Sequence, residues 1–215
     1  MIPSESDDNE YKMYLDMVFH KAESKRIPPK KISDRSLMMH HPWHNVPIGQ
    51  ACPKVVTCVV ETPAESRLKT TVDNPTGLLK VDRILFSSLV FPANYGLIPE
   101  TLTDSNGPLG IFILCQLSIP PLCIMKARPI GLMPMLNNGK KDDIIIGVCV
   151  TDPEYNIYFD ISELPPHKML QINQFFEDSQ TLEHGNAKAF EMEGSNRAKK
   201  EIQRCNTAYR EFFHV

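Results

Sequence analysis

Six side chains with useful chemistry stand where predicted strands and turns end. They combine carboxylates, two cations and one phenol: Glu61, Lys69, Asp82, Arg83, Tyr95 and Asp142. Lysine and arginine beside tyrosine suit a phosphate-bearing ligand, because ammonium and guanidinium groups donate charge-assisted hydrogen bonds to phosphate oxygens. Taken one at a time, each residue is more often a solvated surface charge. A barrel that brought the strand ends to one mouth would join them into a site.

A polar loop at residues 104–110 (DSNGPLG) runs directly into the apolar run 111–115 (IFILC). This pattern predicts a loop that delivers a buried strand. Functional groups often lie on loops of this kind. No Asp or Glu occurs from Ser105 to Lys141, although the chain has 26 acidic residues. The centre of the sequence is therefore depleted in negative charge.

A histidine cluster, HHPWH at residues 40–44, allows a metal-site interpretation. Pro42 disfavours a regular helical or strand array of the three imidazoles. In addition, no cysteine or acidic residue lies close by to complete a tetrahedral ligand set. A structural segment anchored by Trp43, the only tryptophan, is the favoured interpretation.

Composition limits the classes of protein to consider. With 215 residues, 42% hydrophobic and 23% charged, the chain suits one substantial globular domain with an appendage. The net charge of −3 argues against a general nucleic-acid or membrane-surface binder, which normally carries a basic excess. A local anion site remains compatible with this balance.

The cysteines and the N-terminus bear on the compartment. The six cysteines form no CxxC pair, and several stand inside apolar runs, which favours buried free thiols in a reducing compartment. No stretch approaches the ~20 apolar residues of a membrane span, and the acidic start of the chain lacks the layout of a leader peptide. A cytoplasmic protein with no membrane partner is predicted.

The elements that must position the candidate residues are mostly short strands. Residues 55–61 (VVTCVVE) are rich in β-branched side chains, and residues 68–72 and 78–81 flank a turn at 73–77, which predicts a hairpin. Further apolar runs cover 111–115, 124–135 and 144–150. Many short strands separated by Gly and Pro turns predict a closed or nearly closed β-barrel.

The C-terminal part is predicted to be helical. Pro165 and Pro166 precede the apolar positions of one helix, where proline near the first turn costs little: Met169, Ile172, Phe175 and Phe176. A second, longer helix carries one apolar stripe: Ala198, Ile202, Cys205, Tyr209 and Phe212. Packing against the barrel is the favoured role of this stripe. The predicted fold class is α+β, mainly β.

Residues 1–36 are predicted to form a separate N-terminal extension, with the main domain at residues 37–215. Tyr11, Tyr14, Leu15, Val18 and Phe19 recur at helical spacing, and a basic linker follows them. Two interpretations stay open, a helix that docks on a partner and a helix that packs on its own core or frays. The second is favoured, because short terminal helices are marginally stable alone.

Several ordered motifs carry a resemblance to a known family. They are HPWH (41–44), KVDRIL (80–85), NYG (94–96), RPIGLMPM (128–135), DPEY (152–155) and ELPPH (163–167). Together they resemble a soluble family I inorganic pyrophosphatase, with the plant cytosolic type the most similar. The resemblance covers roughly residues 40–178 and extends more weakly to the end of the chain.

The resemblance implies an OB-like five-stranded β-barrel with flanking C-terminal helices. It also implies hydrolysis of pyrophosphate to two phosphates with several Mg²⁺ ions. Such chemistry needs carboxylates, because Mg²⁺ is a hard cation held by oxygen ligands and it lowers the pKa of the attacking water. The family's signature DxDPxD supplies two metal ligands and the acidic residue that takes the proton from this water.

Part of the family's site is retained at matching positions. The resemblance assigns Lys69, Arg83 and Tyr95 to phosphate binding, Glu61 and Asp82 to the acids of the pocket, and Asp142 to a metal ligand. In the signature, Ser105, Gly107 and Gly110 stand at the three aspartate positions, with Gly107 at the general base. Further replacements are Asn137 for a metal aspartate, Ile144 for a lysine, Thr71 for a glutamate and Ser179-Gln180 for a Tyr-Lys pair.

The sequence therefore predicts a member of the pyrophosphatase family with weak or lost Mg²⁺-dependent activity. Loss of a positioned general base alone costs about 10² to 10⁴ in rate, and metal ligands are missing as well. The alternative to a working diphosphatase is a catalytically silent homologue that binds a phosphoanion or assembles, with itself or with active relatives. An OB-like nucleic-acid binder ranks last, because the chain is acidic overall.

Overall fold

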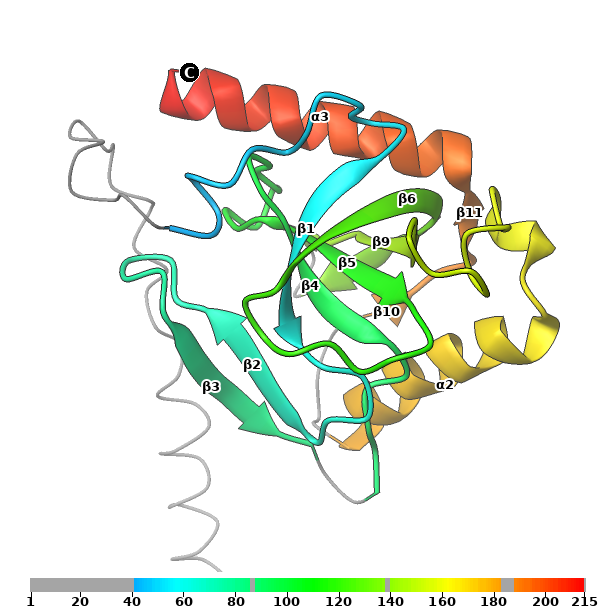
Figure 1. The fold of residues 1–215 in the computed structure, drawn as a ribbon. Coiled ribbons are helices and arrows are strands. Elements are labelled where there is room, and N and C mark those ends of the chain that lie inside the picture. The colour runs from blue at the N-terminus through cyan, green and yellow to red at the C-terminus, as the bar shows by residue number, and fades with distance from the viewer. Residues whose placement is uncertain (1–40, 86–87, 138–139, 183–187, 215) are drawn as a thin grey trace, which may run out of the picture. The chain divides into compact units, whose positions relative to one another are not determined.

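A closed barrel forms the centre of the structure, a computed structural model that describes residues 41–85, 88–137, 140–182 and 188–214. Its five strands are β1 (Val56–Thr62), β4 (Asn94–Ile98), β5 (Leu109–Leu114), β9 (Ile144–Cys149) and β6 (Ile124–Met133). They pair in this order, and β1 pairs with β6 to close the barrel. Only β5 and β9 run parallel, so the barrel is mixed. The predicted OB-like five-stranded barrel is confirmed (Figure 1).

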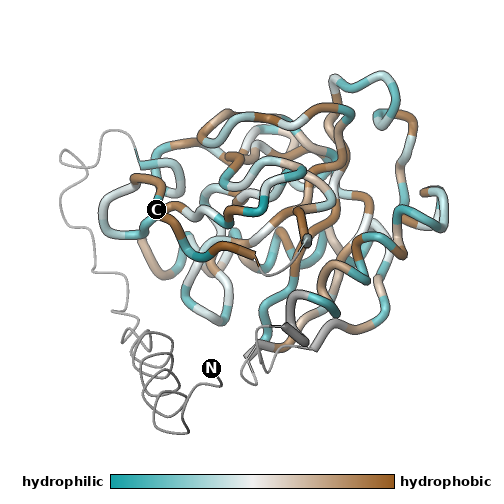
Figure 2. The backbone as a smooth tube through the Cα atoms, turned by 90° about the horizontal axis from the view of Figure 1, so that it is seen from below, coloured by the Kyte–Doolittle hydropathy of each residue, from teal (hydrophilic) through white to brown (hydrophobic). Residues whose placement is uncertain are grey.

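The β-branched runs of the sequence explain which strands lie innermost. Every residue of β1 and of β9 is buried, as expected for nearly continuous apolar strands that are covered on both faces. A short strand, β11 (Glu193–Gly194), extends the sheet at β6. Apolar stretches of the chain gather in the middle of the molecule and polar ones at its outlying loops (Figure 2).

The predicted hairpin forms beside the barrel. It consists of β2 (Leu68–Val72) and β3 (Leu79–Ile84), joined by a turn at residues 73–77. Most of β3 is exposed on both faces, because this two-stranded sheet is not part of the barrel. The hairpin nevertheless carries three of the candidate site residues, Lys69, Asp82 and Arg83.

The predicted single strand at residues 124–135 is wrong in one respect. β6 ends at Met133, and β7 (Met135–Asn137) begins after Pro134. Pro134, which has no backbone N–H to donate to a sheet, lies between the two strands. β7 forms a separate small sheet with β8 (Lys140–Lys141) and β10 (Lys188–Ala189).

Two α-helices cover the barrel. α2 (Pro166–Leu182) follows a short 3₁₀ turn, η2 (Ile161–Glu163), and buries Ile172, Phe175 and Phe176 as predicted. α3 (Ser195–Phe213) buries Ala198, Ile202, Cys205 and Tyr209. Neither helix has a stretch long and apolar enough to cross a bilayer, within the residues that the structure describes.

One residue of the predicted α3 stripe is misplaced. Phe212 is 36% exposed, and Phe213 instead packs against Trp43 in an edge-on contact. Seven residues of an α-helix fall ~20° short of two full turns, so side chains spaced seven residues apart drift away from one buried face. At the end of α3 the position of Trp43 therefore decides which phenylalanine is covered.

The segment around Trp43 is structural, as predicted. Trp43 is fully buried, and its indole N–H donates to the carbonyl of Thr101 at 2.8 Å. His44 stacks on Trp43, and its Nδ1 lies 2.8 Å from the Tyr209 hydroxyl. His40 and the predicted extension at residues 1–36 lie outside the described residues, so the proposed division at residue 37 stays a prediction.

Candidate functional site

The barrel and the β2–β3 hairpin together supply the six residues that the sequence singled out. Glu61 stands near the end of β1, Tyr95 is in β4, and Asp142 lies just before β9. The hairpin supplies Lys69 from β2 and Asp82 and Arg83 from β3. The carboxylates of Glu61, Asp142 and Asp82 all act electrostatically on the Tyr95 hydroxyl. The predicted convergence at one site is therefore observed, whereas the individual roles stay predictions.

Asp82 lies between two cations of the hairpin, Lys69 and Arg83. Its Oδ2 is 3.1 Å from Lys69 Nζ and 3.7 Å from Arg83 Nη1. Although burial works in the opposite direction, these two positive charges hold the pKa of Asp82 below its ordinary value. Lys69 and Arg83 face each other across the β2–β3 pair. The cations that would bind a phosphate are thus partly neutralised by Asp82.

Glu61 is a deeply buried acid. Its Oε1 accepts a hydrogen bond from the backbone N–H of Val72 at 2.6 Å, and Thr70 Oγ1 donates to its backbone carbonyl. Burial raises the pKa of Glu61 to about 7, despite the opposing effects of the Val72 N–H and of Lys69. This side chain therefore exchanges a proton near neutral pH.

We expect Glu61 to make the stability of the protein pH-dependent around neutrality. Its pKa is about 7 in the folded chain and 4.5 in the unfolded one, so the folded state binds the proton more tightly. The resulting stabilisation is complete below pH 4.5 and is lost as the pH rises through 7. It amounts to about 3 kcal/mol in the free energy of unfolding.

Urea unfolding of the wild type and of Glu61→Gln between pH 4.5 and 8 measures this effect. The variant keeps a side-chain oxygen for the Val72 N–H but has no proton to exchange. The unfolding free energy of the wild type should fall relative to that of Glu61→Gln as the pH rises. A difference that stays constant over this range would contradict the assignment.

Tyr95 occupies the space beside Gly110, which the resemblance predicts to be the third signature position. A Cβ atom added at Gly110 would lie 2.5 Å from the Tyr95 hydroxyl oxygen and 3.3 Å from Cζ of the ring. Tyr95 pairs with Phe112 across the β4–β5 ladder, and its ring packs edge-on against that residue. Burial and the surrounding carboxylates raise the pKa of Tyr95, so the hydroxyl stays protonated and acts as a donor.

Gly110→Asp alone should destabilise the protein by about 1–3 kcal/mol, the usual cost of overpacking. Adding Tyr95→Phe removes the hydroxyl and should recover much of this loss in chemical unfolding. Gly107→Asp is the matched control, because nothing lies within 4 Å of a Cβ at that position. Its effect should stay within ±0.5 kcal/mol. Equal losses for Gly107→Asp and Gly110→Asp would show that Tyr95 is not the obstacle.

A hydroxyl stands at the first signature position. Ser105 Oγ donates to Asp142 Oδ1 at 3.1 Å and lies 2.9 Å from Thr103 Oγ1. Thr103 in turn donates to the carbonyl of Gly107, so the loop is closed on itself by hydrogen bonds. Ser105 is buried. Asp142, the one metal-ligand aspartate that the resemblance assigns, is thus bonded to a neutral side chain.

Several replaced positions can be placed only in part. Ile144 is buried at the start of β9, and Thr71 is half-buried in β2. Asn137 ends β7, and Ser179 and Gln180 belong to α2. The side chains of these last three lie outside the described part of the structure.

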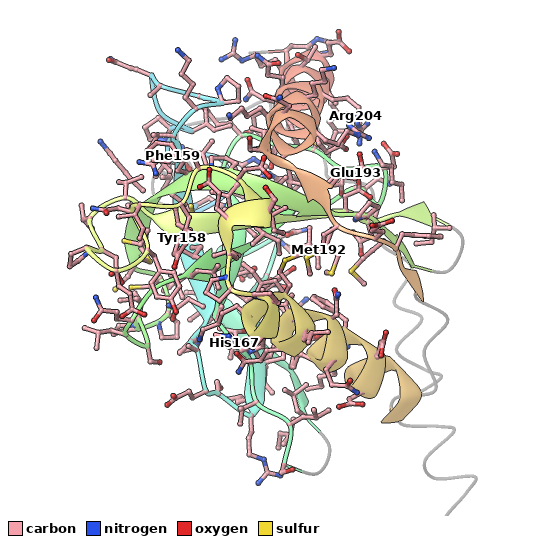
Figure 3. The ribbon with its side chains drawn as sticks, turned by 90° about the vertical axis from the view of Figure 1, so that its right-hand side faces the viewer. Tyr158, Phe159, His167, Met192, Glu193 and Arg204 are labelled. Carbon is pink, nitrogen blue, oxygen red and sulfur yellow. The ribbon has the colours of Figure 1, made fainter. Side chains whose placement is uncertain are left out.

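The structure also shows an ionic network around buried Glu201 that the sequence did not predict. Glu201 on α3 is 1% exposed, and its Oε1 accepts from Arg204 at 2.7 Å while its Oε2 lies 3.0 Å from Lys141 Nζ. Arg204 also pairs with Asp104 of the signature loop at 2.9 Å, and Lys141 with buried Asp143 at 3.0 Å. Figure 3 shows Arg204 on α3. The network links the loop at residues 104–110 and the turn before β9 to this helix.

Only part of this network had a signal in the sequence. Arg197 and Arg204 stand four residues before and three residues after Glu201, which is the spacing of helical ion pairs. The burial of Glu201 and its contact with Lys141, 60 residues away, are tertiary features.

Comparison with known protein sequences gives consistent matches. The sequence model of the family described as inorganic pyrophosphatase matches residues 58–210. The soluble inorganic pyrophosphatase of Oryza sativa subsp. indica is 48% identical over 160 residues, covering 71% of this chain and 75% of the rice protein. Soluble inorganic pyrophosphatase 4 of Arabidopsis thaliana is 51% identical over 147 residues, or 68% of each chain.

A solved structure gives the same result. The crystal structure of inorganic pyrophosphatase from Thermus thermophilus superposes with a TM-score of 0.76 at 29% identity, covering 80% of this chain and 99% of that one. The residues that match the family's sequence model, 58–210, include the hairpin, the loop at residues 104–110 and all of the barrel except the first two residues of β1. This chain belongs to the family of soluble, family I inorganic pyrophosphatases.

Proposed function

We propose that this family member binds a phosphoanion through Lys69, Arg83 and Tyr95, and that its Mg²⁺-dependent hydrolysis of pyrophosphate is weak or lost. The observation that carries the proposal is the state of the signature loop. Residues 105, 107 and 110 carry no carboxylate, and Ser105 donates to Asp142 at 3.1 Å. The space at Gly110 is taken by the Tyr95 hydroxyl.

The donor set does not fit the magnesium cluster that the resemblance implies. Mg²⁺ is held by carboxylate oxygens, substrate oxygens and waters. Within the described ranges, no group of three or more His, Cys, Asp or Glu side chains is arranged to hold a metal ion. Of the site acids, Asp82 is paired with Lys69, and Glu61 accepts from a backbone N–H. These contacts support the proposal that the chain has lost hydrolytic power.

The remaining donors favour retention of anion binding. Lys69, Arg83 and the protonated Tyr95 hydroxyl converge from three strands, and each suits a phosphate oxygen. Asp82 and Asp142 lie beside them and repel an anion. Binding of pyrophosphate or a related phosphoanion is therefore expected to be weak and sensitive to the charge of the pocket.

A sensitive phosphate-release assay tests the catalytic part of the proposal. The purified chain and an active soluble relative, such as the rice protein, are incubated with Mg²⁺ and pyrophosphate under the same conditions. We expect the rate for this chain to be at least about 10² lower. Comparable rates would overturn the proposal and favour a working diphosphatase, the second candidate that family membership supports.

Calorimetric titration with pyrophosphate, without added metal, tests the binding part. We expect heat of binding for the wild type and its loss for Lys69→Met with Arg83→Met. If no binding is found, assembly becomes the remaining proposal, as a homo-oligomer or with active relatives. Sedimentation of the chain alone and mixed with the rice protein then decides it. A cytoplasmic location is proposed with either role.

Asp82→Asn should strengthen phosphoanion binding about tenfold. The substitution removes the carboxylate that lies 3.1 Å from Lys69 Nζ and 3.7 Å from Arg83 Nη1, and interactions between charges at such distances are worth more than 1 kcal/mol near a protein surface. Calorimetric titration with pyrophosphate at two salt concentrations measures the change. Asp73→Asn is the control, since Asp73 pairs with Lys80 at the far end of the same hairpin. Equal effects of the two variants would point to a general charge effect.

A further inference from the structure

A hollow lies at the opposite end of β5 from the candidate site. Gly110 stands near the start of β5 and Cys115 follows its last residue. The hollow has a volume of about 330 Å³, and its lining includes Cys115, Gln116, Met125, Cys149 and Asp152. Three of these five side chains contain sulfur. Nothing in the proposed phosphoanion site uses them.

The two thiols line the same hollow: Cys149 ends β9, and Cys115 is the first residue after β5, its parallel neighbour. β5 and β9 pair with Leu114 opposite Val148, and Cys115 and Cys149 are the next residues. Adjacent strands lie ~4.8 Å apart, and residues at the same register project to the same face of a sheet. Both cysteines pack in one apolar cluster with Met125, and both are free thiols. The sequence alone separated them by 34 positions.

The one carboxylate in the lining is already saturated. Asp152 Oδ2 accepts from the backbone N–H of Gln116 at 2.7 Å. Its Oδ1 accepts from Gln116 Nε2 at 2.8 Å and from the Glu154 N–H at 2.9 Å. A hard cation would have to displace these bonds to reach oxygen. The Cys115 thiol also bonds to Asp152, and Cys149 Sγ lies 3.3 Å from Thr151 Oγ1. Because a thiol is a weak donor and acceptor, a ligand displaces these two contacts at less cost than the bonds to Asp152.

The exposure of the thiols also bears on how a ligand approaches them. Cys149 is 5% exposed, whereas Cys115 is half-buried and closer to solvent. Cys115 is therefore the sulfur that a ligand reaches first.

We infer that Cys115 and Cys149, with Met125 as a third sulfur donor, form a binding site for a soft monovalent metal ion, Cu(I). Thiolate and thioether ligands select Cu(I) over hard or borderline cations. Zn²⁺ almost always takes four protein ligands in structural sites, which this lining does not supply. On binding, two S–H bonds are replaced by two Cu–S bonds and two protons are released, with no change in oxidation state.

Competition with the Cu(I) chelator bicinchoninate tests the site in the reduced, full-length protein. The chain should withdraw one equivalent of Cu(I), release two protons per ion at neutral pH, and show thiolate-to-copper charge-transfer absorption in the ultraviolet. Zn²⁺ at the same concentration should not compete. No withdrawal of Cu(I), or equal competition by Zn²⁺, would overturn the assignment.

Variants locate the site. Cys115→Ser and Cys149→Ser should each weaken Cu(I) binding by more than about 100-fold, beyond the 10- to 100-fold loss caused by removing a merely supporting group. Met125→Leu, which keeps the bulk, should weaken it less but measurably. Exposed Cys123 lies outside the lining, so Cys123→Ser should bind like the wild type.

A folding control keeps the test decisive. Cys115→Ala and Cys149→Ala put no hydroxyl into the apolar wall and should retain thermal stability close to that of the wild type while losing Cu(I). If the folded alanine variants keep the wild-type affinity, or if Cys123→Ser loses it, the site lies elsewhere and the inference is wrong.

Discussion

Restoring four aspartates should raise pyrophosphate hydrolysis about 10² to 10⁴-fold over the parent chain. The variant combines Ser105→Asp, Gly107→Asp, Gly110→Asp and Asn137→Asp, which rebuilds the signature that the resemblance implies. The retained groups, Lys69, Arg83, Tyr95 and Asp142, already lie at one site. The missing carboxylates are therefore the expected deficit. Phosphate release with Mg²⁺ and pyrophosphate measures the gain.

The structure adds one condition to this prediction. The aspartate at position 110 needs the space in which the Tyr95 hydroxyl lies, 2.5 Å from a Cβ at Gly110, so Tyr95 must turn aside. The aspartate at 105 replaces the hydroxyl that now donates to Asp142. We therefore expect the four substitutions to act as a unit, with single changes giving little activity.

A set of asparagines is the matched control. Ser105→Asn, Gly107→Asn and Gly110→Asn fill the same volumes without adding charge, and residue 137 is already Asn. This control should stay as inactive as the parent chain. A parent that already equals the aspartate variant would show that the loss of carboxylates does not limit the reaction.

Glu201→Gln should lower the free energy of unfolding by about 3–5 kcal/mol, the cost of removing one member of a buried ion pair. Glu201 is 1% exposed and lies at hydrogen-bond distance from both Lys141 and Arg204. Without the Glu201 carboxylate, Lys141 keeps its ion pair with Asp143 but loses the one that connects it to α3. Because Arg204 also holds Asp104, the loop at residues 104–110 should lose order along with α3. Chemical unfolding and amide hydrogen exchange of the loop measure the two effects.

Glu193→Gln is the matched control. Glu193 pairs with Arg197 at 3.5 Å, but its side chain is 46% exposed, at the strand end that leads into α3 (Figure 3). Exposed pairs contribute roughly 0–1 kcal/mol, so this variant should remain close to the wild type. Similar losses for Glu193→Gln and Glu201→Gln would show that burial does not set the energy of the network.

The same network predicts how the protein responds to acid. Burial disfavours the Glu201 carboxylate, but the Arg204 hydrogen bonds and Lys141 outweigh it and lower the pKa of Glu201 to about 2. Since the folded pKa lies below the unfolded value of 4.5, its stabilisation is present above pH 4.5 and disappears as the pH falls toward 2. Glu61 acts in the opposite sense between pH 4.5 and 7. In acid unfolding, Glu201→Gln should therefore lack part of the wild-type transition.

The amino-acid sequence by itself determined the family, the barrel and the positions of most elements. Strands rich in β-branched residues, such as β1 and β9, and the apolar stripe of α3 are local patterns that burial then confirmed. The residue types at Ser105, Gly107 and Gly110 are read directly from the sequence, whereas their match to the three aspartates of the family's signature stays a prediction. The strand predicted for residues 124–135 ends before Pro134, and β7 begins after it.

The tertiary structure decided the contacts between residues far apart in the chain. No local pattern shows that Tyr95 fills the space at Gly110, that Ser105 bonds to Asp142, or that Glu201 is buried beside Lys141. Nor does spacing show that Cys115 and Cys149 line one hollow. Closure of the barrel sets these distances, because it fixes which strand ends meet. The contacts that Ser105 and Gly110 make in the loop at residues 104–110 were thus visible only in the folded chain.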